Sequence, residues 1–249
     1  MSLLEAYDES EEIVKAKDFV KNQAKLPSIA IITFKQDLVD IVDTNSCFEK
    51  YSTLSAGQIL NIYKTTYKNK EIILYRTLIG GAATVGIMEE IIARGVKNFI
   101  FFGSCGTLSK NIKPGHFILP TEAYRDEGTS YHYLPVTDFI KVKTVDKLAK
   151  VFDKQNLKYI KTKTWTTDAL YKETKNKMQN RKDAGCLVVD MECASIMAVS
   201  NVRNINSYQF FYSDDTLDGK VWDIRTLKDN RESVLEKCLE IALEVAAEI

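Results

Sequence analysis

Proline is scarce in this chain, and no stretch is rich in glycine, serine or proline. Flexible linkers between domains have such compositions, so nothing in the sequence marks a boundary between two domains. No internal repeat divides the chain either. With 249 residues, 45% of them hydrophobic, the chain is long enough to bury one substantial core. We therefore predict a single large domain.

Histidine is rarer still, and the cysteines never form a Cys-x-x-Cys pair. The two histidines, His116 and His132, and the scattered cysteines show no spacing typical of a zinc site. The number of cysteines, five, is odd, which does not suit a disulfide framework. These features favour a reduced, cytoplasmic protein without a bound metal.

The chain also has no excess of positive or negative charge. The 34 Lys and Arg residues balance the 34 Asp and Glu residues, so no basic surplus points to nucleic acid or to membrane lipid. No apolar run approaches the roughly 20 residues that span a bilayer, and the N-terminus does not resemble a signal peptide. We expect a soluble protein with neither a nucleic acid nor a membrane as its partner.

Strand-like and helix-like segments alternate along the chain. Short β-branched or aromatic runs indicate buried strands, whereas apolar residues spaced by three or four positions indicate amphipathic helices. The alternation predicts an α/β fold with a mixed, mostly parallel central sheet flanked by helices over residues 28–249, after an N-terminal helical extension over residues 1–27. The predicted strands cover residues 28–34, 72–79, 98–102, 116–120, 159–167, 187–190 and 209–212, and the predicted helices cover 11–25, 83–94, 145–155, 194–202 and 231–247.

The stretch Leu187–Cys193 carries the strongest sign of a binding site. An apolar, strand-like run meets Met191 and Glu192, and a helix-like run follows at once. Open α/β sheets bind small ligands at the carboxyl ends of their strands, where Glu192 is expected. A carboxylate there can accept hydrogen bonds from the vicinal hydroxyls of a sugar. A glutamate in the first turn of a helix is also favoured by the helix dipole, so the motif alone leaves both interpretations open.

Further short motifs follow in a specific order and spacing. They are Gly80-Gly81, GSCGTL at 103–108, PGHFI at 114–118, RDEGTSYHY at 125–133, TDALY at 167–171, DME at 190–192 and Ser213-Asp214. Together they resemble the nucleoside phosphorylase superfamily, which includes uridine phosphorylase, hexameric-type purine nucleoside phosphorylase and methylthioadenosine/adenosylhomocysteine nucleosidase. The resemblance covers roughly residues 28–249 and implies the α/β fold of that family.

The resemblance implies cleavage of the N-glycosidic bond of a nucleoside, through a transition state with oxocarbenium character. It assigns Met191 and Glu192 to the ribose, with Glu192 accepting hydrogen bonds from the 2′ and 3′ hydroxyls. It assigns Asp214 to N7 of a purine, as the acid that helps the base to leave; alternatively, Asp214 caps a loop or a helix. The other positions of the base pocket are Cys105, Gly106, Val189 and Trp165, of which Trp165 suits the core equally well.

The positions that hold phosphate in the family depart from its pattern. Gly81 and Ser104 match, but residues 33–38 lack the Gly-Asp-Pro-x-Arg loop, and Phe101 stands where a second arginine is expected. The arginine that a partner subunit contributes has no counterpart over residues 55–63. Because arginine is the best host for a phosphate dianion, these losses leave hydrolysis open beside phosphorolysis. The candidate replacement cations are Lys35, Arg76 and Arg125.

The predicted function is phosphorolysis of a nucleoside to free base and ribose-1-phosphate, with inorganic phosphate as co-substrate and no cofactor. The alternatives are a hydrolytic nucleosidase of the same superfamily and a nucleoside-binding protein without activity. Asp214 favours a purine, and Thr174 and Asn176 replace the residues that read uracil in uridine phosphorylases. His132 either faces the substrate or is structural. The resemblance also implies a homo-oligomer, either a dimer or a hexamer.

Overall fold

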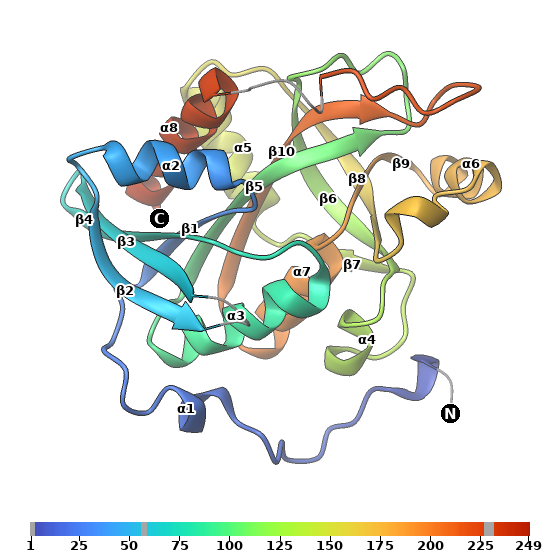
Figure 1. Cartoon of the computed structure of the whole chain (residues 1–249). Coiled ribbons are helices and arrows are strands. Elements are labelled where there is room, and N and C mark those ends of the chain that lie inside the picture. Colours follow the sequence, from blue (N-terminus) through green and yellow to red (C-terminus); the bar gives the residue numbers. More distant parts are fainter. Residues whose placement is uncertain (1–2, 56–58, 227–231) are drawn as a thin grey trace.

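A computed structural model describes residues 3–55, 59–226 and 232–249. Within these residues ten strands form one mixed sheet, which confirms the predicted α/β fold (Figure 1). The strands are β1 Ile29–Thr33, β2 Glu49–Ser55, β3 Ile59–Tyr67, β4 Lys70–Arg76, β5 Asn98–Thr107, β6 Phe117–Asp126, β7 Phe139–Lys141, β8 Tyr159–Thr167, β9 Cys186–Asp190 and β10 Asn206–Thr216.

Helices flank this sheet, as expected, and none of the described ones is long and apolar enough to cross a membrane. The helices are α1 Ala16–Phe19, α2 Gln36–Thr44, α3 Gly81–Ala93, α4 Ser130–Tyr133, α5 Val145–Lys154, α6 Lys175–Asp183, α7 Cys193–Val202 and α8 Glu232–Glu248, with short 3-10 turns η1 Leu3–Glu5 and η2 Leu170–Lys172. The predicted last helix began at Arg231, which lies outside the described residues.

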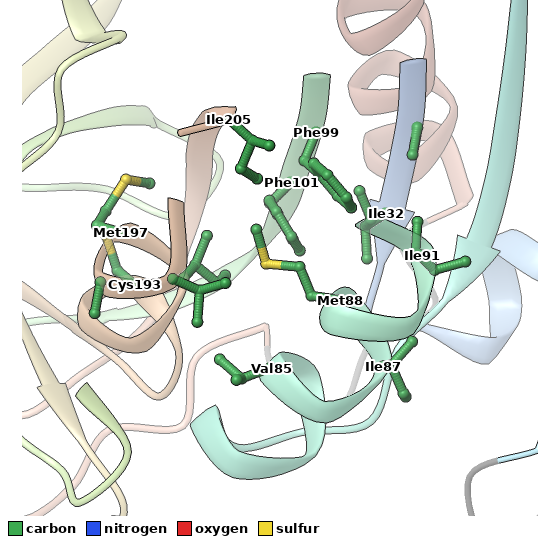
Figure 2. Close-up of a cluster of buried hydrophobic side chains, with 14 of the residues drawn as sticks. Ile32, Val85, Ile87, Met88, Ile91, Phe99, Phe101, Cys193, Met197 and Ile205 are labelled. Atoms are coloured by element: carbon green, nitrogen blue, oxygen red, sulfur yellow. The ribbon is translucent and has the colours of Figure 1, made fainter. Parts of the chain in front are cut away.

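Two apolar clusters lie on opposite faces of the central strand β5. Side chains alternate across a strand, so Phe99 and Phe101 pack with α3 and α7 (Figure 2), whereas Ile100 and Phe102 pack with α2, α5 and α8. All four side chains are fully buried. The alternation explains why residues 98–102 form an uninterrupted apolar run, as strands covered on both faces do.

The strand order brings the strands that carry the sequence motifs together. The order is β10-β6-β8-β9-β5-β1-β4-β3-β2, β7 pairs with β6, and a further pairing joins β10 to β5. This last pairing closes β5, β9, β8, β6 and β10 into a ring. Because β1 and β10 both run parallel to β5, these three strands end at the same edge of the sheet. Ligands bind at such an edge in open α/β sheets.

The helix predicted over residues 11–25 is wrong for most of its length. Only α1, a single turn, is present, and Ile13, Val14 and Phe19 are 97%, 89% and 70% exposed. A short helix in water gains most of its stability by packing an apolar face. Because these apolar side chains remain mostly exposed, the periodic pattern alone does not produce the helix.

Two strands extend beyond the predicted ends. β5 continues to Thr107 and β10 to Thr216, so residues 103–107 and 213–215 are strand residues rather than loops. The glycines of β5 mark close packing instead of a turn. A Cβ atom at Gly103 would lie 3.0 Å from Cδ2 of Phe34, and one at Gly106 would lie 2.9 Å from Cγ1 of Val189.

Candidate active site

A cavity of about 410 Å³ lies against the C-terminal parts of β5, β9 and β10. The loops after β1, β4 and β8 and the segment that follows β10 complete its wall. Its size and its place at the edge of the sheet are those of a small-molecule site.

Glu192 is fixed on the wall of this cavity, where β9 ends and α7 begins. Its Oε1 accepts a hydrogen bond of 2.8 Å from the backbone N–H of Gly80. Gly80 has a φ of 101°, a conformation that residues with a side chain rarely adopt. A glycine before α3 therefore orients the donor that holds the carboxyl group.

Asp190 shapes the turn that carries Glu192. One of its carboxylate oxygens accepts from the backbone N–H groups of Glu192 and Cys193, at 2.8 and 2.6 Å. The other accepts from the hydroxyls of Thr164 and Thr166 on β8, at 2.8 and 2.9 Å. These bonds account for a buried carboxylate and lock the loop between β9 and α7.

Four carboxyl groups line the cavity, those of Glu173, Asp190, Glu192 and Asp215, and burial raises the pKa of each. Burial, with a contribution from the charge of Asp190, raises the pKa of Glu192 to about 8. Burial likewise raises the pKa of Glu173 to about 7 and the pKa of Asp215 above its ordinary value. Lys35 is the only cationic side chain among the described residues of the wall. Desolvation therefore favours the protonated, neutral form of these acids.

The aspartate on the wall is Asp215 rather than the predicted Asp214. Asp215 Oδ2 accepts from Trp222 Nε1 at 2.6 Å, and Oδ1 would lie 3.2 Å from a Cβ atom at Gly106. Asp214 is buried outside the wall, where Oδ1 accepts from the Thr226 hydroxyl at 2.7 Å. Neighbouring side chains of a strand point to opposite faces, so only one of the two can face the cavity.

Most of the other predicted site residues meet in this cavity. Together with Glu192, the wall contains its neighbour in the chain, Met191. It also contains Val189 and Gly106, which lie near Asp215, and the candidate cation Lys35 from the loop after β1. The predicted residues that line the cavity are Lys35, Ser104, Cys105, Gly106, Val189, Met191 and Glu192.

Besides Asp214 and Arg76, four predicted residues lie outside the wall. Trp165 is fully buried and donates from Nε1 to Asp126 at 2.9 Å, as a core residue does. Gly81 lies behind the cavity, where a Cβ atom would come within 2.2 Å of Ser195 Oγ. His132 lines a separate cavity between the N-terminal segment and α3.

Arg125 also lies outside the wall. It is buried, and its guanidinium nitrogens donate hydrogen bonds to other parts of the protein. Its Nε donates to Ser130 Oγ at 2.8 Å, and its terminal nitrogens donate to the carbonyls of Pro135 and Leu134 at 2.6 and 3.1 Å. The guanidinium also stacks on the ring of Tyr131. Arg125 thus shapes the loop around α4 and has no donor directed at the cavity.

Sequence analysis missed several residues of the wall. Leu170, Tyr171 and Glu173 come from the turn after β8, and the first two belong to the TDALY motif. Trp222 and Ile224 come from the irregular segment after β10. The motif was a usable signal for the turn after β8, whereas nothing periodic marks residues 217–226.

Known proteins resemble this chain in sequence. A family model described as the phosphorylase superfamily matches residues 28–247. A DeoD-type purine nucleoside phosphorylase of Clostridium novyi (strain NT) is 28% identical over 188 residues, 74% of this chain and 79% of that protein. Its counterpart in Bacillus cytotoxicus (strain DSM 22905 / CIP 110041 / 391-98 / NVH 391-98) is 27% identical over 186 residues, 73% of this chain and 77% of that protein.

Solved structures show the same fold. A purine nucleoside phosphorylase from Toxoplasma gondii in complex with immucillin-H has a TM-score of 0.76 at 18% identity, covering 91% of this chain and 92% of that one. A uridine phosphorylase from Vibrio fischeri ES114 has a TM-score of 0.73 at 20% identity, covering 92% of each chain. At such identities these likenesses concern the fold alone.

Proposed function

The chain belongs to the phosphorylase superfamily, and on that premise we propose that it cleaves the N-glycosidic bond of a nucleoside by phosphorolysis, yielding free base and ribose-1-phosphate. The observation that carries the proposal is the buried carboxyl group of Glu192, held at the end of β9 on the wall of the cavity. The relatives at 27 and 28% identity, which are named purine nucleoside phosphorylases, support the same reaction.

In this proposal Glu192 holds the sugar. Its carboxylate accepts hydrogen bonds from the 2′ and 3′ hydroxyls, and Met191 packs against the ring. The Gly80 N–H and the turn shaped by Asp190 hold the carboxyl group in place before the nucleoside binds, which lowers the entropy cost of binding. With a pKa of about 8, Glu192 is mostly ionised only above that pH, and this anion also stabilises the positive charge that develops on the ribosyl ring in the transition state.

Asp215 serves the leaving base. A base leaves more readily when it is protonated or hydrogen-bonded as the glycosidic bond breaks. The raised pKa of Asp215 keeps a proton available closer to neutral pH than an exposed aspartate could. Trp222 fixes one oxygen of the carboxyl group, so the other can donate to a ring nitrogen.

Ser104 and Lys35 serve phosphate. Both line the cavity, Ser104 from β5 and Lys35 from the loop between β1 and α2. The Lys35 ammonium has no ion pair within the described residues, so it is available to a dianion. Phosphate attacks the anomeric carbon, the glycosidic bond breaks, and its electron pair goes to the base, which takes up a proton from Asp215.

Hydrolysis is the second candidate, and one observation favours it. No arginine lines the described part of the cavity, while four carboxyl groups do. Such a wall attracts a phosphate dianion weakly, whereas a neutral water molecule is not repelled. In that reaction water would attack the same carbon, and free ribose would replace ribose-1-phosphate.

A panel of purine and pyrimidine nucleosides, assayed with and without phosphate, tests the proposal. We expect base release that requires phosphate and forms ribose-1-phosphate. We also expect Lys35→Met to raise the KM for phosphate by about tenfold or more, the effect of one lost charge-assisted hydrogen bond. The control is Lys143→Met, which removes an exposed ammonium outside the cavity.

The same panel separates the alternatives. Equal base release without phosphate, with free ribose as product, would establish hydrolysis instead. Nucleoside binding without any turnover would mean that the cavity binds its ligand without reaction.

A further inference from the structure

Glu173 is a carboxyl group on the cavity wall for which the proposed reaction has no role. It follows the turn η2, directly before α6. Its backbone N–H donates to the Leu170 carbonyl at 3.3 Å, and this bond fixes the main chain. Within the described residues its side chain accepts no hydrogen bond and forms no ion pair. Glu192 and Asp215, by contrast, each accept from a fixed donor.

Within the described residues, the surroundings of Glu173 supply no hydrogen-bond donor to its carboxyl group. Burial raises its pKa to about 7, and the charge of Asp215 adds to the rise. Lys177 is the one cation that lowers it, and the Lys177 ammonium pairs with Asp126 at 3.2 Å instead. A half-buried carboxylate without a donor carries a desolvation cost, which a ligand N–H group would remove.

Glu173 lines the same cavity as Asp215, the proposed acid for the leaving base, and as Met191 and Glu192, the proposed sugar site. The charge of Asp215 also contributes to the raised pKa of Glu173. We propose that Glu173 determines specificity by accepting a hydrogen bond from an amino group of the base, so that the cavity selects 6-aminopurines over 6-oxopurines. This inference rests on the proposed function.

The selection follows from the chemistry of the two groups. An ionised carboxylate only accepts hydrogen bonds, and an exocyclic amino group donates them. A carbonyl oxygen at position 6 also only accepts, so it would face Glu173 without a hydrogen between them. Sites built around a hydrogen bond reject analogues that cannot form it more strongly than apolar pockets do.

The test compares adenosine with inosine, which differ at position 6, in the native protein and in Glu173→Gln. Glutamine keeps the shape of the side chain but can donate to a carbonyl oxygen as well as accept. At pH 8.5, where Glu173 is mostly ionised, we expect the native protein to prefer adenosine in kcat/KM. We expect Glu173→Gln to lower the adenosine-to-inosine ratio by about tenfold or more, the value of one hydrogen bond to a charged group.

Glu236→Gln, an exposed change on α8, is the matched control and should leave the ratio unaltered. A purely structural role of Glu173 would lower both activities together. An unchanged ratio in Glu173→Gln, with both nucleosides still cleaved, would overturn this inference and leave the proposed function intact. Failure to cleave any nucleoside in the full panel would instead overturn the proposed function, and this inference with it.

Discussion

At the scale of single residues, the two consecutive aspartates of β10 have different surroundings. Asp215 reaches the cavity and is held by Trp222, whereas Asp214 is held by Thr226 outside the wall. The ladder between β10 and β5 shifts register between Ser213 and Thr216, the segment that contains both carboxyl groups. A sequence motif of two adjacent aspartates contains no information on such an irregularity.

The pair provides a matched test of the acid in the proposed reaction. We expect Asp215→Asn to slow release of a purine by about a hundredfold or more, because the amide has no proton to transfer to the base. Asp214→Asn should retain most of the activity, provided that its unfolding midpoint in urea shows a folded protein. The rates are measured on adenosine by chromatography. A large loss in Asp214→Asn with little loss in Asp215→Asn would assign the role of the acid to Asp214 instead.

At the scale of elements, the start of α3 is pressed against α7. Gly81 is the first residue of α3, and Ser195 of α7 lies where its side chain would be. The Ser195 hydroxyl also donates to buried Glu127 at 2.5 Å, so it has little freedom to move away. The contact fixes Gly80, whose N–H holds Glu192. Packing between two helices therefore positions the carboxyl group that we propose binds the sugar.

Substitutions at two glycines of α3 provide a matched test of this contact. Gly81→Ala would place a Cβ atom 2.2 Å from Ser195 Oγ, and we expect a loss of about 1–3 kcal/mol in the free energy of unfolding from overpacking. Gly86→Ala has open space around it, and we expect a gain of about 0.5–1 kcal/mol from helix propensity. Urea unfolding measures both. Equal effects of the two substitutions would contradict tight packing at Gly81.

Most buried strands could be predicted from their apolar runs, whereas several elements with a weaker pattern could not. The mostly apolar run of residues 187–190 predicted from sequence alone where β9 ends, and hence where Glu192 lies. α6 was missed because none of its residues is buried, so it has no apolar face to recognise. β2 and β3 were missed because polar residues interrupt their apolar ones.

The residues of the site likewise fall into those that could be predicted from sequence and those that could not. Residues carried by strands and their immediate ends, such as Ser104 and Met191, were predictable from motifs in a fixed order. Glu173 and Trp222 come from irregular segments, where no period links a residue to a face. Trp165 shows the limit of a motif: its position matched, but its ring is buried in the core beside Cys186 and Leu108.

At the scale of the whole molecule, the two clusters on either side of the sheet restrict where a phosphate-binding cation can stand. Phe101, at the position of a family arginine, is fully buried between β5 and the α3–α7 layer (Figure 2). An arginine there would be an unpaired charge inside the core. In the proposed phosphorolysis the cation would come from the edge of the sheet instead, where Lys35 is the only cationic side chain among the described residues of the wall.

The closed ring of β5, β9, β8, β6 and β10 brings residues that are distant in sequence to one cavity. Gly80, Asp190 and Glu192 act together there, although more than a hundred residues separate the first from the last. The central claim is that this cavity binds the ribose of a nucleoside through the Glu192 carboxylate.

A crystal structure of the protein soaked with a non-cleavable nucleoside analogue tests that claim most directly. We predict the 2′ and 3′ hydroxyls within about 3 Å of the Glu192 carboxylate oxygens, the usual hydrogen-bond distance, and no bound nucleoside in the Glu192→Ala variant. A nucleoside bound elsewhere, or one whose ribose does not contact Glu192, would contradict the account.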